Sequence, residues 1–332
     1  MIKKSKILQL LAILFAFTLV TAACGDDDDS SSSASETTES AESDESSDDE
    51  VTLTQDGESL LDTVQARGTL NCGVSGAAVA FSTLDPSGEM VGFDADFCRA
   101  VAAAVLGDAS AVNFVSLTAA ERFTAVQSGD IDVLMRNTTW TQSRDTDVGM
   151  DFGPTTYYDG QQLMAKASDG FSGSSTVADL AGATICTNAG TTTEKNIGDA
   201  AVAAGIEINL QTYEDFDIVT DNFISGACDV VTTDGSALVG RKAQQQPEGE
   251  EWVIFPGAPI SKEPLGPTYG QNDSKWADAV NWTVYATIIA SEKGINSGNA
   301  ASVVGNDSFD AEAQRLMGGE GELQSLMGLA PD

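Results

Sequence analysis

The 332-residue sequence predicts an α/β protein with two lobes joined by a double hinge. Three observations predict this fold class. Strand and helix patterns alternate along the chain, the alternation occurs twice, and the part that can fold is long enough for two domains. Alternating strands and helices are typical of parallel sheets with right-handed crossovers. A protein of this kind binds its ligand in the crevice between the lobes.

The first alternation begins with a short buried strand at 70–75. A helix follows at 93–106, because Phe97, Val101 and Val105 are four residues apart and therefore share one face. The pattern then predicts a strand at 112–115, a helix at 119–127 and a strand at 131–135. Together these elements form a βαβαβ unit.

The second alternation follows residues 152–154 and repeats the order of the first. It predicts strands at 183–186, 208–213 and 229–232, with helices at 193–203 and 215–225. A long helix at 274–293 carries Trp276, Val280, Val284 and Ile288 at fourfold spacing. We expect this last segment to return to the first lobe. The predicted boundaries are 52–155 with 257–332 for lobe 1, and 156–256 for lobe 2.

The N-terminus has the features of an export signal. Three lysines precede an apolar run at 7–20 that is too short for an ordinary spanning helix. The run ends in Thr21-Ala22-Ala23-Cys24, which resembles a lipobox and predicts a lipoprotein signal peptide at 1–23 with lipidation of Cys24. The alternative is a plain secretory signal with an incidental cysteine.

Residues 24–51 form an acidic segment rich in Ser, Asp and Glu. From residue 26 to residue 50 it contains no aromatic and no basic residue. Such a composition cannot bury enough apolar surface to offset the entropy lost on ordering, and its like charges repel. We therefore expect a disordered tether between the lipid anchor and the folded body.

Charge and composition exclude several classes of function. The chain has a net charge of −35, and the part outside the signal and tether still has 39 acidic residues against 13 basic ones. This balance argues against nucleic-acid binding. The sequence contains no histidine, which excludes a Ser-His-Asp triad, a Cys-His pair and histidine-ligated metal sites. We expect no metal, no cofactor and no enzymatic activity.

Four cysteines remain if Cys24 is lipidated, and an even number in an exported protein suggests two disulfides. We favour Cys72–Cys98 and Cys186–Cys228, because each pair then lies within one predicted lobe. The other two pairings and buried free thiols stay open as alternatives.

Eight segments together resemble the type II periplasmic binding proteins for amino acids, in the general L-amino-acid-binding branch. They are LNCGVS (70–75), VGFDADFCRAVAAAV (91–105), ERFTAVQSGDIDVL (121–134), NTTWTQSRDTDVGMDF (137–152), TYYDGQ (156–161), AGTTTE (189–194), CDVVTTD (228–234) and SKEPLGP (261–267). The resemblance implies a two-lobed fold with a double-strand hinge. It also implies an extracytoplasmic component of an ABC importer that captures free L-amino acids and delivers them to permease subunits.

The location that follows is the outer face of the cell membrane or the periplasm. We expect a monomer that contacts the membrane through its lipid anchor alone.

The resemblance also implies the ligand-binding residues. Arg144 corresponds to the carboxylate clamp, since a guanidinium can hold a carboxylate through two parallel hydrogen bonds. Its alternative is a surface salt bridge with Asp145 or Asp147. Asp234 ends a strand and would accept from the ligand ammonium; its alternative is a turn residue before Gly235.

Polar residues from both lobes complete the predicted site. Thr191 and Thr192 open a helix and would face the same carboxylate as Arg144, although Thr191 and Glu194 also fit a capping box. Asn137 and Thr139 alternate with Thr138, so they should point in one direction towards the amino-acid backbone.

Two further residues concern the ligand side chain. The resemblance places Ser75 where relatives specific for basic side chains carry an acidic residue, so its small neutral hydroxyl argues against a dedicated binder of basic amino acids. Ala77, Ala78 and Ala80 leave the wall beside it small. Trp140 either stacks on the ligand side chain or seals the hinge.

The accepted side chains stay open between a broad range and the acidic and amide amino acids. Two other functions also remain: a cyclohexadienyl or arogenate dehydratase-like enzyme, and a surface scaffold that binds no ligand.

Overall fold

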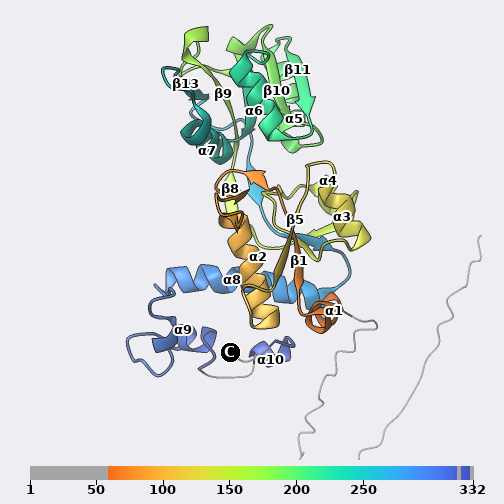
Figure 1. The fold of residues 1–332 in the computed structure, drawn as a ribbon, viewed down its shortest axis with the longest axis vertical. Coiled ribbons are helices and arrows are strands. Elements are labelled where there is room, and N and C mark those ends of the chain that lie inside the picture. The colour runs from red at the N-terminus through yellow and green to blue at the C-terminus, as the bar shows by residue number, and fades with distance from the viewer. Residues whose placement is uncertain (1–58, 320–322, 330–332) are drawn as a thin grey trace, which may run out of the picture. The chain divides into compact units, whose positions relative to one another are not determined.

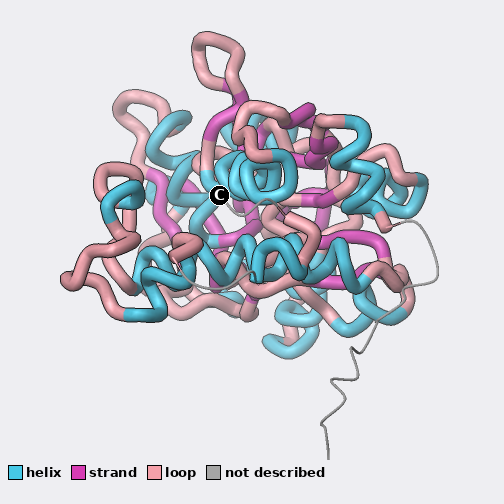
Figure 2. The backbone as a smooth tube through the Cα atoms, turned by 90° about the horizontal axis from the view of Figure 1, so that it is seen from below, coloured by secondary structure: helices cyan, strands magenta, loops and turns pink. Residues whose placement is uncertain are grey.

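The computed structural model describes residues 59–319 and 323–329. The predicted signal peptide, Cys24 and the acidic tether lie outside the described residues. The described chain is a mixed α/β structure with two five-stranded sheets, and Figure 2 distinguishes its helices, strands and loops by colour.

The first sheet has the strand order β5-β1-β6-β15-β7. β1 pairs in parallel with β5 on one side and with β6 on the other, whereas β15 is antiparallel to both β6 and β7. Its strands are β1 (Leu70–Val74), β5 (Val112–Ser116), β6 (Val133–Leu134), β7 (Met150–Phe152) and β15 (Thr268–Gly270). Because β15 comes from the last third of the chain, the predicted return to the first lobe is confirmed.

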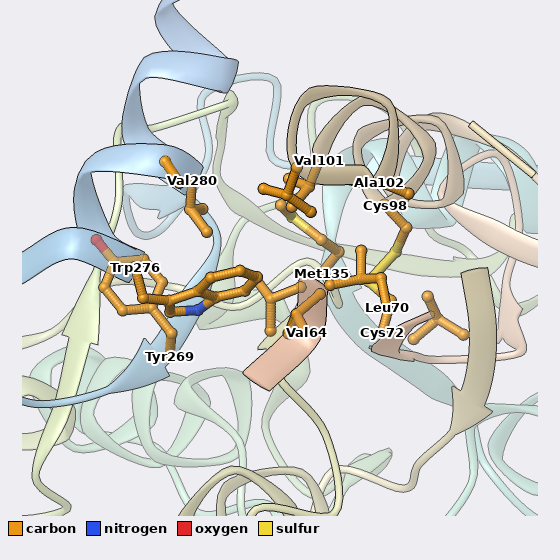
Figure 3. Close-up of a cluster of buried hydrophobic side chains, with 14 of the residues drawn as sticks. Val64, Leu70, Cys72, Cys98, Val101, Ala102, Met135, Tyr269, Trp276 and Val280 are labelled. Carbon is orange, nitrogen blue, oxygen red and sulfur yellow. A yellow bond between two sulfur atoms is a disulfide. The ribbon is translucent and has the colours of Figure 1, made fainter. Parts of the chain in front are cut away.

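Helices α1 (Leu60–Arg67), α2 (Phe93–Leu106), α3 (Arg122–Ser128), α4 (Gln142–Thr146) and α8 (Ser274–Glu292) belong to this lobe. In the largest hydrophobic cluster, α2 and α8 pack together against β1. Figure 3 shows Trp276 and Val280 of α8 converging with Val101 of α2 on the same core. No helix in the described ranges is both long enough and apolar enough to cross a bilayer.

The second sheet repeats the first, with the order β11-β10-β12-β9-β13. Its strands are β9 (Gln161–Lys166), β10 (Thr184–Asn188), β11 (Asn209–Tyr213), β12 (Val230–Asp234) and β13 (Trp252–Phe255). Helices α5 (Thr192–Ala204), α6 (Phe216–Ser225) and α7 (Gly235–Gln245) lie beside this sheet in Figure 1. In both sheets the first strand of the unit lies between the second and third, which confirms the predicted repetition.

Two antiparallel strands connect the sheets. The chain leaves β7 through β8 (Tyr157–Asp159) to reach β9, and it returns from β13 through β14 (Glu263–Leu265) to reach β15. β8 and β14 pair with each other, Tyr158 opposite Pro264. The predicted double-strand hinge is therefore present.

A small sheet of β2 (Ala77–Ala78), β3 (Ser82–Leu84) and β4 (Met90–Val91) precedes α2 and was not predicted. It brings the chain close to the start of α2, where Gly92 has φ 119° and an added Cβ would lie 2.6 Å from the Phe81 carbonyl oxygen. The N–H groups of Phe93 and Asp94 then donate to the carbonyls of Ala80 and Phe81. This contact begins the helix and orients Asp94.

Two predicted elements differ from the structure, one residue expected to be buried is exposed, and one helix was missed. The helix expected from residue 119 starts at Arg122, because the Glu121 carboxylate accepts hydrogen bonds from the N–H and hydroxyl of Thr118 and so forms a local turn first. The strand expected at 131–135 is reduced to β6. Ile288, expected on the buried face of α8, is 38% exposed. Helix α7 was missed because Gly235 and Gly240 weaken its helical pattern.

Both favoured disulfides are present. Cys72 of β1 is bonded to Cys98 of α2, and Cys186 of β10 is bonded to Cys228, two residues before β12. The two disulfides close chain separations of 26 and 42 residues. Cys72 and Cys186 are each the third residue of the central strand of their parallel unit, so each lobe is cross-linked at an equivalent place.

We predict that each disulfide stabilises its own lobe. Replacing Cys186 and Cys228 by alanine should lower the free energy of unfolding by about 3–4 kcal/mol, because the cross-link restricts the unfolded chain. Urea denaturation followed by intrinsic fluorescence measures this change. Replacing Cys72 and Cys98 should give a similar loss, and an unchanged unfolding midpoint in both double variants would contradict the prediction.

Candidate functional site

A cavity of about 200 Å³ lies between the two lobes. Its lining lies at or beyond the carboxyl ends of parallel strands β1, β5 and β6 in lobe 1, and of β10, β11 and β12 in lobe 2. Ligands of open α/β sheets bind at this edge. Seven of the predicted residues line the cavity: Ser75, Asn137, Thr139, Arg144, Thr191, Thr192 and Asp234.

Arg144 reaches the cavity from α4. Thr141 caps this helix by accepting the backbone N–H of Arg144, and the side chain is only 7% exposed. Its guanidinium donates to the carbonyl of Thr139 at 2.8 Å and lies over the Phe123 ring. Burial lowers the pKa of Arg144 to about 10, with Glu263 and Asp234 acting in the opposite direction, so the group is a cation at neutral pH.

The alternative role for Arg144 finds no support in the described residues, where it forms no ion pair with Asp145 or Asp147. The remaining guanidinium donors are therefore available to an anion in the cavity.

Asp234 faces the cavity from the other lobe. It is the last residue of β12, it precedes α7, and it is 5% exposed. Its carboxylate accepts a hydrogen bond from the Asn137 side-chain amide at 3.1 Å, a contact that crosses between the lobes. Burial, followed by the nearby carboxylates of Asp159 and Glu263, raises the pKa of Asp234 to about 7. A cation beside Asp234 would favour the ionised form.

Asn137 is held by its backbone. Its φ angle of 33° lies in the left-handed region, and its N–H donates to the buried carboxylate of Asp94 at 2.8 Å. Burial raises the pKa of Asp94 to about 7 against the opposing effects of this N–H and of Arg136. Asn137 and Thr139 line the cavity, whereas the Thr138 hydroxyl bonds the Arg136 carbonyl. The predicted alternation thus holds, although β6 has already ended at Leu134.

At the start of α5, the capping role of Thr191 is present. Its hydroxyl accepts the N–H of Glu194 at 3.1 Å and donates to the Asn188 carbonyl at 2.7 Å. The Glu194 carboxylate in turn accepts the N–H of Gly190. Because the first N–H groups of a helix have no intrahelical acceptors, this end of α5 offers backbone donors beside the cavity.

Glu263 is a residue of the site that the sequence reasoning missed. It lies on hinge strand β14, is 1% exposed, and accepts hydrogen bonds from the side chains of Thr139 at 2.6 Å, Thr192 at 3.1 Å, Asn196 at 2.9 Å and Ser261. It therefore joins polar side chains of both lobes. While Thr139 and Thr192 donate their protons to Glu263, their oxygens can accept from a ligand ammonium but cannot donate to a ligand carboxylate.

Small side chains form one wall of the cavity. Ser75, Ala77 and Ala78 line it, and the Ser75 backbone N–H is bonded to the Ser82 hydroxyl. Trp140 is the one predicted ligand-binding residue that does not line the cavity. Its ring stacks on Phe152 at 5.9 Å, nearly parallel, and it is 43% exposed. Its backbone N–H donates to the carbonyl of Pro264 on hinge strand β14 at 2.9 Å, which favours the second role considered for Trp140, at the hinge.

Two arginines of lobe 1, Arg122 and Arg136, also line the cavity and were not predicted as site residues. Arg122 begins α3 and is 3% exposed, and Arg136 donates from Nε to the Leu117 carbonyl at 2.9 Å. Arg122 lies within segment 121–134, one of the eight that carry the family resemblance, and Arg136 follows this segment by two residues. The sequence contains no signal that separates an inward-facing arginine from a solvated one, so only the tertiary structure identifies them.

The chain is similar to bacterial proteins named for the amino acids that they bind. The chain is 44% identical over 279 residues to a glutamate/glutamine/aspartate/asparagine-binding protein of Rhodobacter capsulatus, covering 82% of this chain and 79% of that protein. It is 44% identical over 261 residues to a general L-amino acid-binding periplasmic protein of Rhizobium johnstonii, covering 78% and 74%.

A solved structure is similar over most of the described chain. The ABC transporter periplasmic binding protein from Brucella ovis with glutathione bound is 43% identical, with a TM-score of 0.77, and the match covers 83% of this chain and 85% of that one. Residues 70–293 match the family described as bacterial extracellular solute-binding proteins, family 3. The chain therefore belongs to the bacterial extracellular solute-binding proteins, family 3.

Proposed function

We propose that this protein is the extracytoplasmic solute-binding component of an ABC importer, and that it captures free L-amino acids between its lobes and delivers them to the permease. One observation carries the proposal. A buried guanidinium of lobe 1, Arg144, and a buried carboxylate of lobe 2, Asp234, line the same cavity. These two charges match the two ends of a zwitterion.

The chemistry of the α-amino acid head explains the other groups. The α-carboxylate is costly to desolvate unless it is paired, and Arg144 together with the start of α5 supplies donors for it. The α-ammonium has three protons. Asp234 and the hydroxyl oxygens of Thr139 and Thr192 supply acceptors, since both hydroxyls donate to Glu263.

Closure of the lobes follows from the contacts that cross between them. Asn137 of lobe 1 donates to Asp234 of lobe 2, and Arg241 of α7 donates to the Ala77 carbonyl. We propose that the ligand ammonium takes the place of the Asn137 amide as the principal partner of Asp234. The closed form is then favoured because only closure pairs both ends of the zwitterion.

The relatives support the substrate class, since their names describe amino-acid-binding proteins. The small wall of Ser75, Ala77 and Ala78 has no charge to select a basic side chain. We propose a range that is broad or centred on acidic and amide side chains, and a monomer with lobes at 52–155 with 257–332 and at 156–256. The strands of the first sheet, from 70–152 and 268–270, and those of the second, from 161–255, support these boundaries.

An enzymatic alternative is a cyclohexadienyl or arogenate dehydratase-like activity on the same fold. Such an enzyme needs a general acid in the cavity, and the raised pKa of Asp234 is the observation that would suit this role. The cross-lobe pairing of Asp234 with Asn137 and its position opposite Arg144 favour recognition of an ammonium instead.

The first prediction concerns the two charged groups. Arg144→Ala and Asp234→Ala should each weaken L-amino-acid binding by well over tenfold, because removing one partner of a buried charge pair costs roughly 2–5 kcal/mol. Isothermal titration calorimetry measures the affinities. Lys195→Ala, an exposed charge on α5, is the matched control and should bind like the wild type.

Near-wild-type affinity in either cavity variant would remove the basis of the proposal. Turnover of prephenate or arogenate by the wild-type protein, without amino-acid binding, would favour the enzyme.

A second prediction concerns pH. Because the pKa of Asp234 in the ligand-free protein is about 7, the carboxyl is protonated below that pH and must lose its proton before it can pair with an ammonium. Affinity should therefore level off near pH 8, where the carboxyl is ionised and the ligand still carries its ammonium, and fall about tenfold per pH unit well below pH 7. Calorimetry in buffers of different ionisation enthalpy should show release of a proton on binding at pH 6.

Asp94 has a similarly raised pKa and is the control for this experiment. The pH dependence should persist in Asp94→Asn if Asp234 is responsible. A pH-independent affinity between pH 5 and 8 in the wild type would contradict the role of Asp234.

A third prediction concerns the membrane. We propose that Cys24 carries the lipid anchor and that the acidic segment 24–51 acts as a tether. Cys24→Ala should abolish metabolic labelling with a radioactive fatty acid and move the protein from the membrane fraction to the soluble fraction. Labelling that survives the substitution would show that Cys24 is not the modified residue.

A further inference from the structure

We propose that Arg122 and Arg136 form a second anion subsite in the cavity, which binds a carboxylate on the side chain of the ligand. The substrate class is then the L-α-amino acids that carry a second carboxylate. This inference rests on the proposed function, because it takes Arg144 and Asp234 as the partners of the amino-acid head.

Arg122 is a buried cation whose side chain forms no hydrogen bond and no ion pair with the described residues. It is 3% exposed, its Nε atom is buried without a hydrogen-bond acceptor, and its guanidinium lies over the Phe123 ring at 4.8 Å. It forms no ion pair within the described ranges. Leaving a guanidinium buried and unpaired is costly, so an inward-facing arginine of this kind indicates a ligand anion that completes it.

The surroundings of Arg122 increase this cost. Burial lowers the pKa of Arg122 well below its ordinary value, and the neighbouring cations Arg136 and Arg144 act in the same direction, opposed by Asp234. Three guanidinium groups of one lobe therefore share one cavity. Their mutual repulsion is relieved when anions bind between them.

Arg136 completes the subsite. Its Nε is bonded to the Leu117 carbonyl, which leaves its terminal nitrogens available beside the cavity lining of Ser116 and Thr118. Burial lowers the pKa of Arg136 to about 10, with Asp94, Asp215 and Asp234 opposing the effect. Arg136 thus has acidic neighbours at longer range but no ion pair in the described part of the chain.

Charge matching decides the substrate class. A zwitterion is neutral, and its two ends match Arg144 and Asp234 without involving Arg122 or Arg136. Arg241, the fourth arginine at the cavity, is already paired with Asp217. A ligand with a second carboxylate supplies the anion that the two remaining arginines lack, and a planar guanidinium is suited to hold it.

Two kinds of molecule share this chemistry. One is a free acidic amino acid, whose side-chain carboxylate is close to the head. The other is a γ-glutamyl peptide, whose glutamyl residue supplies the head and whose C-terminus supplies the second carboxylate. The similar structure from Brucella ovis holds glutathione, a peptide of the second kind.

The experiment compares ligands that differ only in the second charge. Calorimetry on wild-type protein and on Arg122→Met should use L-glutamate and its neutral isostere L-glutamine, with glutathione as a third arm. The wild type should bind at least one of the two dicarboxylic ligands more than tenfold more tightly than glutamine. Arg122→Met should lose about thirtyfold or more for the dicarboxylic ligand and less than about threefold for glutamine.

The design also tests for a merely structural role. Methionine removes an unpaired buried charge while filling similar volume, so the melting temperature of ligand-free Arg122→Met should be equal to or higher than that of the wild type. Arg136→Met should reproduce the selective loss, and Arg122→Lys should restore part of the affinity for the dicarboxylic ligand. If Arg122→Met does not fold, the last two variants provide the same comparison.

The outcomes separate this inference from the proposed function. An equal loss for glutamate, glutathione and glutamine in Arg122→Met would overturn the subsite, as would a wild type that binds glutamine as tightly as both dicarboxylic ligands. A wild type that binds no amino acid or γ-glutamyl peptide at all would overturn the proposed function itself. Tighter binding of glutathione than of glutamate identifies the γ-glutamyl peptide as the source of the second carboxylate.

Discussion

The buried carboxylate of Asp234, facing the buried guanidinium groups of the other lobe, is the interaction on which the rest of the site depends. Burial disfavours the charged form of each group, because it raises the pKa of Asp234 and lowers the pKa values of Arg122 and Arg144. A ligand that places a charge of opposite sign beside each buried group stabilises the ionised form of that group. A small ligand that carries both an ammonium and a carboxylate can pair with Asp234 and with the arginines at the same time. This pairing is the basis of the proposed transport role.

The hinge is part of the binding chemistry as well as a mechanical link. Glu263 lies on β14 and accepts hydrogen bonds from Thr139 of lobe 1 and from Thr192 and Asn196 of lobe 2. It thereby determines which way the two threonine hydroxyls point their protons. The carboxylate that spans the hinge thus converts these hydroxyls into acceptors on the cavity side, which suits an ammonium better than a carboxylate.

The duplicated architecture explains why the site can form where it does. Each sheet places the carboxyl ends of its parallel strands at the edge that borders the cavity, and each lobe is cross-linked from the equivalent residue of its central strand. Each lobe holds its own charged groups, and only the paired strands β8 and β14 join the two sheets, which is the connection that the proposed closure requires.

Local patterns in the sequence were sufficient for the two βαβαβ units, for α2 and α8 and for the two disulfides, because these features follow from periodicity and spacing. Arg144 and Asp234 were predicted as ligand-binding residues from the resemblance to a known family. Other features depend on contacts between distant segments. The inward direction of Arg122, the four hydrogen bonds of Glu263 and the stacking of Trp140 on Phe152 are decided by packing across the fold, because burial of a polar side chain depends on neighbours that no local pattern specifies.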